Sequence, residues 1–465
     1  MLKKIKQVVF KGFFPYDKEN NLSHNSLKII LLGFSFFFII GSYSVLRPLK
    51  ASVFLALIGK EYVPIAKMIS IIILFPCMLF YAKLVDRLKQ SQVVRFFLIL
   101  YSIGGVVFAL FLLHPTIGLN NSQTSVYRLI GWLFYFYLDL FSAFVVSTFW
   151  AFANSINNPE YAKQNYGKIV AFSRIGGIST PLISWLLIQK TSLPGSISIP
   201  ILIIATSLFL LLASFCISRI IKKIPHQLLH GYEAAYKVDK KQSKSKVKAG
   251  LLQGLMLMIT KPYVLAIFGI TYSYEVISVI LDYQMQILMS IANNNAILGM
   301  SSFMFIYTAS FQGLGLVFAL FGTSNFLRWI GVKKCLLIMP LMTILLMLSL
   351  LAYPSLSMIF IIMVLLRALN YGFNAPIKEI LYIPTTKNIK FKSKAWIESF
   401  GRSLSKTSGS TLNLIAQAKN TLNIIRLDSI YAIGISIVWT AISCFIGKKY
   451  NEIIENNKVI GEDDL

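Results

Sequence analysis

The sequence repeats one feature along most of its length, namely runs of about 20 apolar residues that contain few charges. At 1.5 Å per residue, a helix of that length crosses a bilayer's hydrocarbon core, which is about 30 Å thick. Backbone N–H and C=O groups find no water there, so helices are expected. Eleven runs are clear, at 27–46, 62–85, 93–113, 127–149, 167–188, 197–217, 263–289, 303–322, 335–353, 357–373 and 430–446.

Composition supports lipid as the solvent for most of the chain, because 56% of its residues are apolar and 14% are charged. Soluble domains average about 25% charged residues. A twelfth stretch, 402–425, is more polar and is predicted to be a packed or cavity-lining helix. We therefore predict an all-α polytopic membrane protein with about 12 transmembrane helices.

The formal charge of +27 raises the possibility of a nucleic-acid partner, but the placement of the cations argues against it. Lysine and arginine crowd the N-terminal segment, the turn after the second run and the stretch after the sixth, whereas the alternate connections are nearly free of them. This is the positive-inside pattern. It predicts cytoplasmic N- and C-termini, the lipid bilayer as a partner and no nucleic-acid partner.

Residues for enzymatic or metal chemistry are not grouped in the sequence. The four cysteines lie in or beside apolar runs without paired spacing, and the four histidines lie in flanks and loops. No phosphate-cradling Gly-Lys-Ser loop occurs. We expect no metal, no cofactor and no enzyme; a lipid-modifying membrane enzyme or a receptor is a third hypothesis that would require a His/acid cluster or a large extramembrane domain.

The runs divide into two sets around a hydrophilic stretch. We predict a cytoplasmic N-terminal segment at 1–26, a six-helix half at 27–221, a cytoplasmic linker at 222–260, a second six-helix half at 261–447 and a cytoplasmic tail at 448–465. Two parallel six-helix repeats are the major-facilitator architecture, whose substrate site lies near the bilayer midplane between the halves. The expected state is monomeric.

Two cations, Arg47 and Lys50, interrupt the apolar stretch that starts the first helix and continues to Ile58. A charge inside a span costs about 2.5–3.5 kcal/mol on insertion scales. Spaced three apart, both share one helical face and predict an anionic substrate such as a phosphate. The alternative is that Pro48 ends the helix and both side chains snorkel to the interface.

Further charges fall within other runs. Lys67 begins the second run, where snorkelling is equally reasonable, so it ranks below Lys50. The other candidates are Asp139, Arg174, Asp282 and Arg367. The carboxylates would relay protons or pair with a cation from the other half as a gate. Lys378 and Glu379 follow the tenth run and would, from the pattern alone, form a solvated charge pair.

Several segments resemble the ATP/ADP translocases of obligate intracellular bacteria and plastids, and the resemblance covers nearly the whole chain. They are Tyr43-Ser-Val-Leu-Arg-Pro-Leu-Lys, Ser147-Thr-Phe-Trp-Ala-Phe-Ala-Asn, Lys378-Glu-Ile-Leu-Tyr-Ile-Pro, Lys392-Ser-Lys-Ala-Trp-Ile-Glu and Gly401-Arg-Ser-Leu-Ser-Lys-Thr-Ser-Gly-Ser. The resemblance implies a bacterial inner-membrane location and transport roles for Lys50, Asp139, Asp282 and Lys378, with Arg367 at a position that is often basic.

The resemblance implies nucleotide transport, most simply ATP/ADP exchange by alternating access, with a nucleotide as the substrate partner. Arg47, Lys50 and Lys378 would neutralise its phosphates. Ala51, Ala375 and Gln286 stand where the family usually has charged residues. These differences keep open a second hypothesis, a major-facilitator transporter of another nucleotide or organic anion, for example by proton symport.

Overall fold

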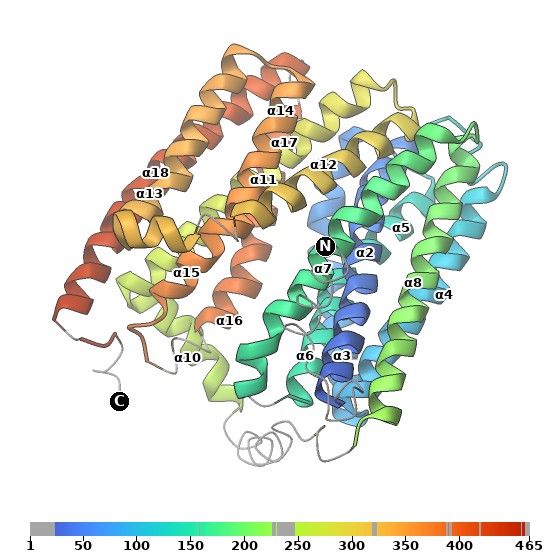
Figure 1. The fold of residues 1–465 in the computed structure, drawn as a ribbon. Coiled ribbons are helices and arrows are strands. Elements are labelled where there is room, and N and C mark those ends of the chain that lie inside the picture. Colours follow the sequence, from blue (N-terminus) through green and yellow to red (C-terminus); the bar gives the residue numbers. More distant parts are fainter. Residues whose placement is uncertain are drawn as a thin grey trace, which may run out of the picture. The chain divides into compact units, whose positions relative to one another are not determined.

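The computed structural model describes residues 24–157, 159–225, 229, 247–318, 323–386, 389, 393–417, 420–456 and 458–460. Within these ranges nearly every residue is helical and no strand forms, although an isolated bridge joins Thr385 and Ile460. The predicted all-α class is therefore confirmed (Figure 1).

The helices follow one another with short connections. The earlier ones are α2 (His24–Leu57), the 3₁₀ turn η1 (Lys60–Tyr62), α3 (Val63–Arg87), α4 (Gln90–Leu113), α5 (Leu129–Asp139), the π-helix η2 (Ser142–Val146), α6 (Ser147–Ser155), α7 (Pro159–Lys190) and α8 (Gly195–Lys223). The later ones are α10 (Val247–Thr260), α11 (Pro262–Ala292), α12 (Ile297–Val317), α13 (Thr323–Ala352), α14 (Leu356–Leu369), the π-helix η5 (Asn370–Asn374), α15 (Ala375–Leu381), α16 (Lys394–Trp396), the π-helix η7 (Ile397–Gly401), α17 (Arg402–Gln417) and α18 (Thr421–Glu455).

Eleven helical stretches of the described chain are long and apolar enough to cross a membrane, and each overlaps one predicted run. The tenth stretch, Leu356–Leu381, extends beyond its predicted end at residue 373. The π-helix η5 keeps the chain helical from α14 into α15. The prediction that Lys378 and Glu379 follow the tenth span is therefore wrong, because both lie within its last turns.

Helix α2 continues through Pro48 to Leu57. Proline lacks an N–H donor, but membrane helices tolerate it because neighbouring groups and local adjustments satisfy the freed carbonyl. Arg47 and Lys50 are therefore inside the first span, and the alternative in which Pro48 ends the helix is wrong.

The polar twelfth stretch is a helix with different bounds from those predicted. Helical structure runs from α16 through η7 to the end of α17 at Gln417, and Asn420 is already the N-cap of α18. The stretch does not meet the apolar criterion for a span, yet Ser405, Ser410 and Asn413 are fully buried. Its packed character was predicted correctly; the end at residue 425 was not, since 421–425 begin the next helix.

The helices form two compact units. The first comprises Met1–Lys50, Leu74–Ser122 and Leu133–Lys241, and the second comprises Ala51–Ile73, Gln123–Trp132 and Gln242–Leu465. The division runs through α2, α3 and α5. The predicted halves, 27–221 and 261–447, follow span order rather than this packing and remain a prediction.

In the first unit, α2 packs closely against α7 and α8. Thr180 Oγ1 donates to Gly41 O at 2.9 Å, and Ser42 Oγ donates to Thr206 O at 3.0 Å. At Gly176 an added Cβ would lie 2.5 Å from the backbone oxygen of Phe37. Small and hydroxyl side chains of this kind let helix backbones approach each other in a membrane protein.

In the second unit, α11 occupies the centre of the packing, because it contacts α10, α12, α14, α17 and α18. Gly409 of α17 permits the closest approach, since an added Cβ would lie 2.9 Å from Val279 Cβ. Helix α13 packs along α18. The side chains of α11 are thus held on several sides by neighbouring helices.

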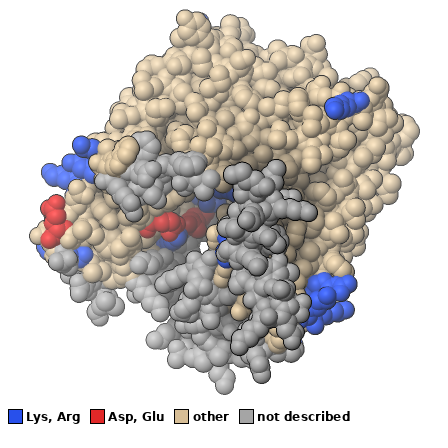
Figure 2. Space-filling view, in the orientation of Figure 1, with Lys and Arg blue, Asp and Glu red and all other residues tan. Residues whose placement is uncertain are grey.

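The described surface is largely apolar and uncharged, with charged groups confined to a few places (Figure 2). Large side chains are strongly exposed on the spans; Ile72 is 72% and Phe75 is 70% exposed. Apolar surface of this extent indicates contact with lipid rather than water. The protein is a multi-pass membrane protein.

Several sequence-based predictions concern residues outside the described ranges. These are the basic N-terminal residues up to Lys18, the linker cations from Lys237 to Lys246, His226, His230 and Lys392.

Gly176 allows a test of the packing between α2 and α7. We expect Gly176→Ala to destabilise the protein by about 1–3 kcal/mol, because the obstructing Phe37 oxygen is backbone and cannot rotate away. Gly167→Ala, in the same helix with nothing near its added Cβ, is the matched control and should be neutral or stabilising. The melting temperature in detergent measures both; equal effects would contradict the close approach.

Candidate functional site

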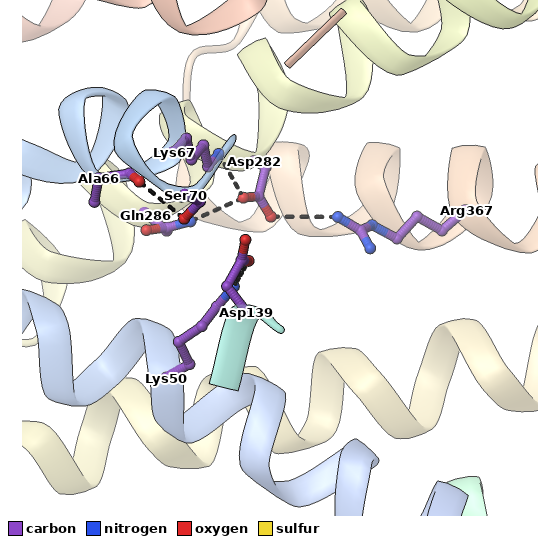
Figure 3. A network of polar contacts seen from close by, with 8 residues as sticks. All are labelled: Lys50, Ala66, Lys67, Ser70, Asp139, Asp282, Gln286 and Arg367. Atoms are coloured by element: carbon purple, nitrogen blue, oxygen red, sulfur yellow. Dashed lines mark hydrogen bonds and ion pairs between the residues drawn. The ribbon is translucent and has the colours of Figure 1, made fainter. Parts of the chain in front are cut away.

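The first unit contains a buried ion pair between the first and fourth spans. Lys50 Nζ, on α2, donates to Asp139 Oδ1 at 2.6 Å (Figure 3). The two side chains are only 17% and 18% exposed. The Tyr135 ring, one turn earlier on α5, has its centroid 4.6 Å from the same Nζ. A carboxylate and an aromatic face together stabilise a cation that lipid alone would reject.

The second unit has a larger cluster centred on Asp282 of α11. Lys67 Nζ donates to Asp282 Oδ2 at 2.9 Å, and Arg367 Nη2 donates to Oδ1 at 3.3 Å. Gln286 Nε2 also donates to Oδ2, at 2.9 Å. The sticks of Figure 3 show these side chains converging on the Asp282 carboxylate. One carboxylate thus holds cations from α3 and α14, which lie in different predicted halves of the sequence.

Arg367 is the most deeply placed charge of this cluster, at 6% exposure. The ring centroids of Tyr307 and Phe311 each lie 5.8 Å from its guanidinium carbon. Ring faces and the Asp282 carboxylate offset the loss of water around the guanidinium. The side chain also lines a small cavity with Tyr274, Ser278, Thr343, Met363 and Trp439 among its other walls.

The fourth span and the tenth carry the same local device. Asp139 lies three residues before the π-helix η2, and Arg367 lies three residues before the π-helix η5. Each π-helix has five residues, and each charged residue pairs with the first span of its own predicted half, α2 or α11. π-Helical turns are frequent at functional sites because they re-aim side chains. The two predicted halves therefore correspond at the level of the site, with the signs of the charges exchanged.

Lys378 lies apart from these pairs in its interactions. It is half-buried on α15, and the charges that act on it most strongly are Glu275 and Arg402. Arg402 Nε is 3.7 Å from Glu275 Oε1. The neighbouring Glu379 accepts a hydrogen bond from Lys394 Nζ at 2.7 Å. The expected solvated pair of Lys378 with Glu379 is therefore replaced by a pair of Glu379 with Lys394.

The remaining predicted cations, Arg47 and Arg174, are half-buried on α2 and α7. Arg47 lies one turn before Lys50 on the same helix. Among the described residues, no group of three or more His, Cys, Asp or Glu side chains could hold a metal ion.

Sequence reasoning ranked Lys67 too low, because its position near the start of a span was equally consistent with snorkelling. Gln286 was noted only as a difference from the family pattern, although it donates to Asp282. The pair of Glu275 with Arg402 was missed. The spacing of Glu275 seven residues before Asp282 on α11 is the signal that could have found it, because residues two turns apart share a helical face.

Comparison with solved structures identifies the class of protein. The chain resembles a bacterial homologue of the iron transporter ferroportin in an inward-facing state, with a TM-score of 0.62 and 13% identity over 90% of this chain and 98% of that one. A mutant of the peptide transporter POT gives a TM-score of 0.59 with 11% identity, covering 90% and 95%. At such identities the likeness concerns the fold alone. The fold is that of a major-facilitator transporter.

The model of the TLC ATP/ADP transporter family matches residues 11–359, and the chain belongs to that family. It is 24% identical to ADP,ATP carrier protein 1 of Rickettsia prowazekii (strain Madrid E), over 84% of this chain and 85% of the carrier. It is 25% identical to ADP,ATP carrier protein 1 of Chlamydia trachomatis serovar D, over 84% and 82%. The predicted family is confirmed, and the protein is a transporter rather than an enzyme.

The pair of Lys50 with Asp139 predicts non-additive stability effects. Lys50→Met or Asp139→Asn alone should each cost about 3–5 kcal/mol at most, because each leaves a buried charge unpaired. The double variant should be more stable than the sum of the single effects predicts, since neither charge remains. Melting temperatures of the four proteins form the cycle, and strict additivity would mean that the two side chains do not interact.

Proposed function

We propose that this chain exchanges nucleotides of the ATP/ADP type across a bacterial inner membrane by alternating access. Membership of the ATP/ADP transporter family supports this proposal. The observation that carries it within the molecule is the pair of Lys50 with Asp139, a cation held ready inside the first span. An incoming phosphate can take over that lysine, because both the carboxylate and the phosphate are anions that compete for the same N–H donors.

In this proposal the cations divide the work of neutralising the phosphates. Lys50 and Arg47 share a face of α2 and would meet one part of the phosphate chain. Lys378, half-buried beside Arg402 and Glu275, would meet it at the end of the tenth span. Arg367 would act through Asp282, whose carboxylate it shares with Lys67. Substrate binding and the rearrangement of these pairs are thereby coupled.

Asp282 would serve as the gating carboxylate. Its ion pair with Lys67 links the second span to the seventh, so it must break if the predicted halves rock against each other. Arg367 keeps a partner contact with Asp282 when Lys67 departs, so the carboxylate is never left alone in the membrane.

The remaining features of the proposal follow the charge pattern of the chain. The cytoplasmic termini rest on the positive-inside distribution, and the monomeric state rests on the two-repeat architecture, which builds a complete site from one chain. Exposed side chains such as Phe75 and Ile72 would contact the lipid bilayer directly.

Transport into liposomes tests the central assignment. Purified protein in liposomes preloaded with ADP should take up labelled ATP, and Lys50→Ala should reduce uptake by at least about 100-fold, because a phosphate contact made by a desolvated cation is lost. Lys190→Ala removes an exposed cation at the end of α7 and should leave uptake unchanged. A Lys50→Ala protein that transports normally would remove Lys50 from the site.

The same assay with competing unlabelled compounds defines the substrate. ATP and ADP should compete most strongly, ahead of other nucleotides and of organic anions that lack a nucleoside. Strongest competition by a non-nucleotide anion would instead reject nucleotide exchange.

The gating role of Lys67 predicts a change of rate rather than of binding. In Lys67→Met, Asp282 keeps Arg367 and Gln286 as partners, so the protein should fold and bind nucleotide with a similar KM. The maximal exchange rate should fall by about ten-fold, equivalent to about 1.4 kcal/mol in the barrier. A raised KM with an unchanged maximal rate would show that Lys67 contacts substrate instead.

A further inference from the structure

A second group of buried polar atoms lies where α11 packs against α17 and α18. Five side chains on these three helices are 0% exposed and each has an oxygen without a hydrogen-bond partner within the described part of the chain: Gln284, Ser410, Asn413, Asp428 and Ser429. Asp428 is the one ionisable member. Buried polar atoms are normally paired, so each of these oxygens requires an explanation.

Asp428 is the most demanding member of this group, since neither Oδ1 nor Oδ2 has a hydrogen-bond partner. It also forms no ion pair with any described residue. An ionised carboxylate taken from water into such a place costs several kcal/mol unless a cation or donors accompany it. Either a cation joins it there or the carboxyl is neutral.

Gln284 provides the complementary partner. Its Nε2 donates to Ile425 O at 3.3 Å, one turn before Asp428 on α18, which leaves Oε1 without a donor. The Gln284 side chain lies next to Asp428. The opposite orientation of the amide would give Asp428 a donor, but it would set Oε1 against the carbonyl of Ile425. One proton on Asp428, donated to Gln284 Oε1, satisfies both side chains at once.

The neighbouring titratable groups supply no positive charge. On α11 the Tyr283 hydroxyl interacts electrostatically with Asp428 and accepts a hydrogen bond from Gln417 Nε2 of α17. Glu61 of η1 acts on the same hydroxyl and is itself acidic. On α18, Arg426 is exposed to the surroundings of the protein. A proton is therefore the simplest cation that fits.

We propose that Asp428 and Gln284 form a buried proton-binding site between α18 and α11. Gln284 and Asp282 are two residues apart on α11, so they point to nearly opposite sides of that helix. The proton stabilises the packing behind α11, and that packing positions Asp282. Loss of the proton at alkaline pH leaves an unpaired carboxylate in the interface and weakens exchange, whichever nucleotide is carried.

Infrared spectroscopy of the purified protein detects the proton directly and requires no transport. At neutral pH the wild type should show the carbonyl stretch of a protonated carboxylic acid, and Asp428→Asn should lack it. Asp139→Asn is the matched control and should keep the band, because Asp139 is paired with Lys50. Gln284→Leu should keep the band but shift it, since the hydrogen bond to Oε1 is lost; this variant decides the matter if Asp428→Asn fails to fold.

The pH profile of exchange in liposomes is the second readout. Wild-type exchange should fall by about ten-fold per pH unit once Asp428 ionises, because the protonated fraction falls in that proportion. Asp428→Asn, which cannot ionise, should lose this alkaline fall. Replacing sodium by choline should change neither protein.

Three results would overturn the site: no carboxylic acid band at neutral pH, a band that survives in Asp428→Asn, or an exchange rate that depends on sodium through Asp428. Nucleotide exchange itself would stand in each case, because it is tested separately through Lys50.

Discussion

The cost of a charge inside a membrane helix is the constraint on which the rest of this structure depends. Each deeply placed cation with a described ion pair is matched to a carboxylate on another span: Lys50 to Asp139, and both Lys67 and Arg367 to Asp282. Since such pairs roughly balance rather than stabilise a fold, their value lies in exchange of partners. A phosphate that enters can replace a carboxylate without leaving any charge alone.

The two predicted halves meet this constraint with one local device. The fourth and tenth spans each place a charge three residues before a five-residue π-helix and pair it with the first span of the same half. The signs are opposite, with Asp139 in one and Arg367 in the other. A repeat can thus keep its backbone geometry while its halves differ in which ligand charges they offer.

Helix α11 links the site to the packing around it. Asp282 lies on one side of this helix and Gln284 lies on nearly the opposite side, against α18. Polar helix α17 can stay within the bundle because Gly409 allows close contact and buried Ser and Asn side chains bond to nearby carbonyls, as Asn413 does to Val279. Its low apolarity is therefore a consequence of burial in protein rather than exposure to lipid.

The sequence by itself determined the all-α membrane fold and eleven spans, because helix length and apolarity answer directly to bilayer thickness. It also singled out Lys50, Asp139, Asp282 and Arg367, since isolated charges in apolar runs are conspicuous. Only the tertiary structure decided the partners: Lys67 joins Asp282 across 215 positions of sequence. It also carried the tenth span past Lys378 and buried Asp428 without an ion pair among the described residues. Pairing depends on which helix faces meet, and local periodicity carries no information about that.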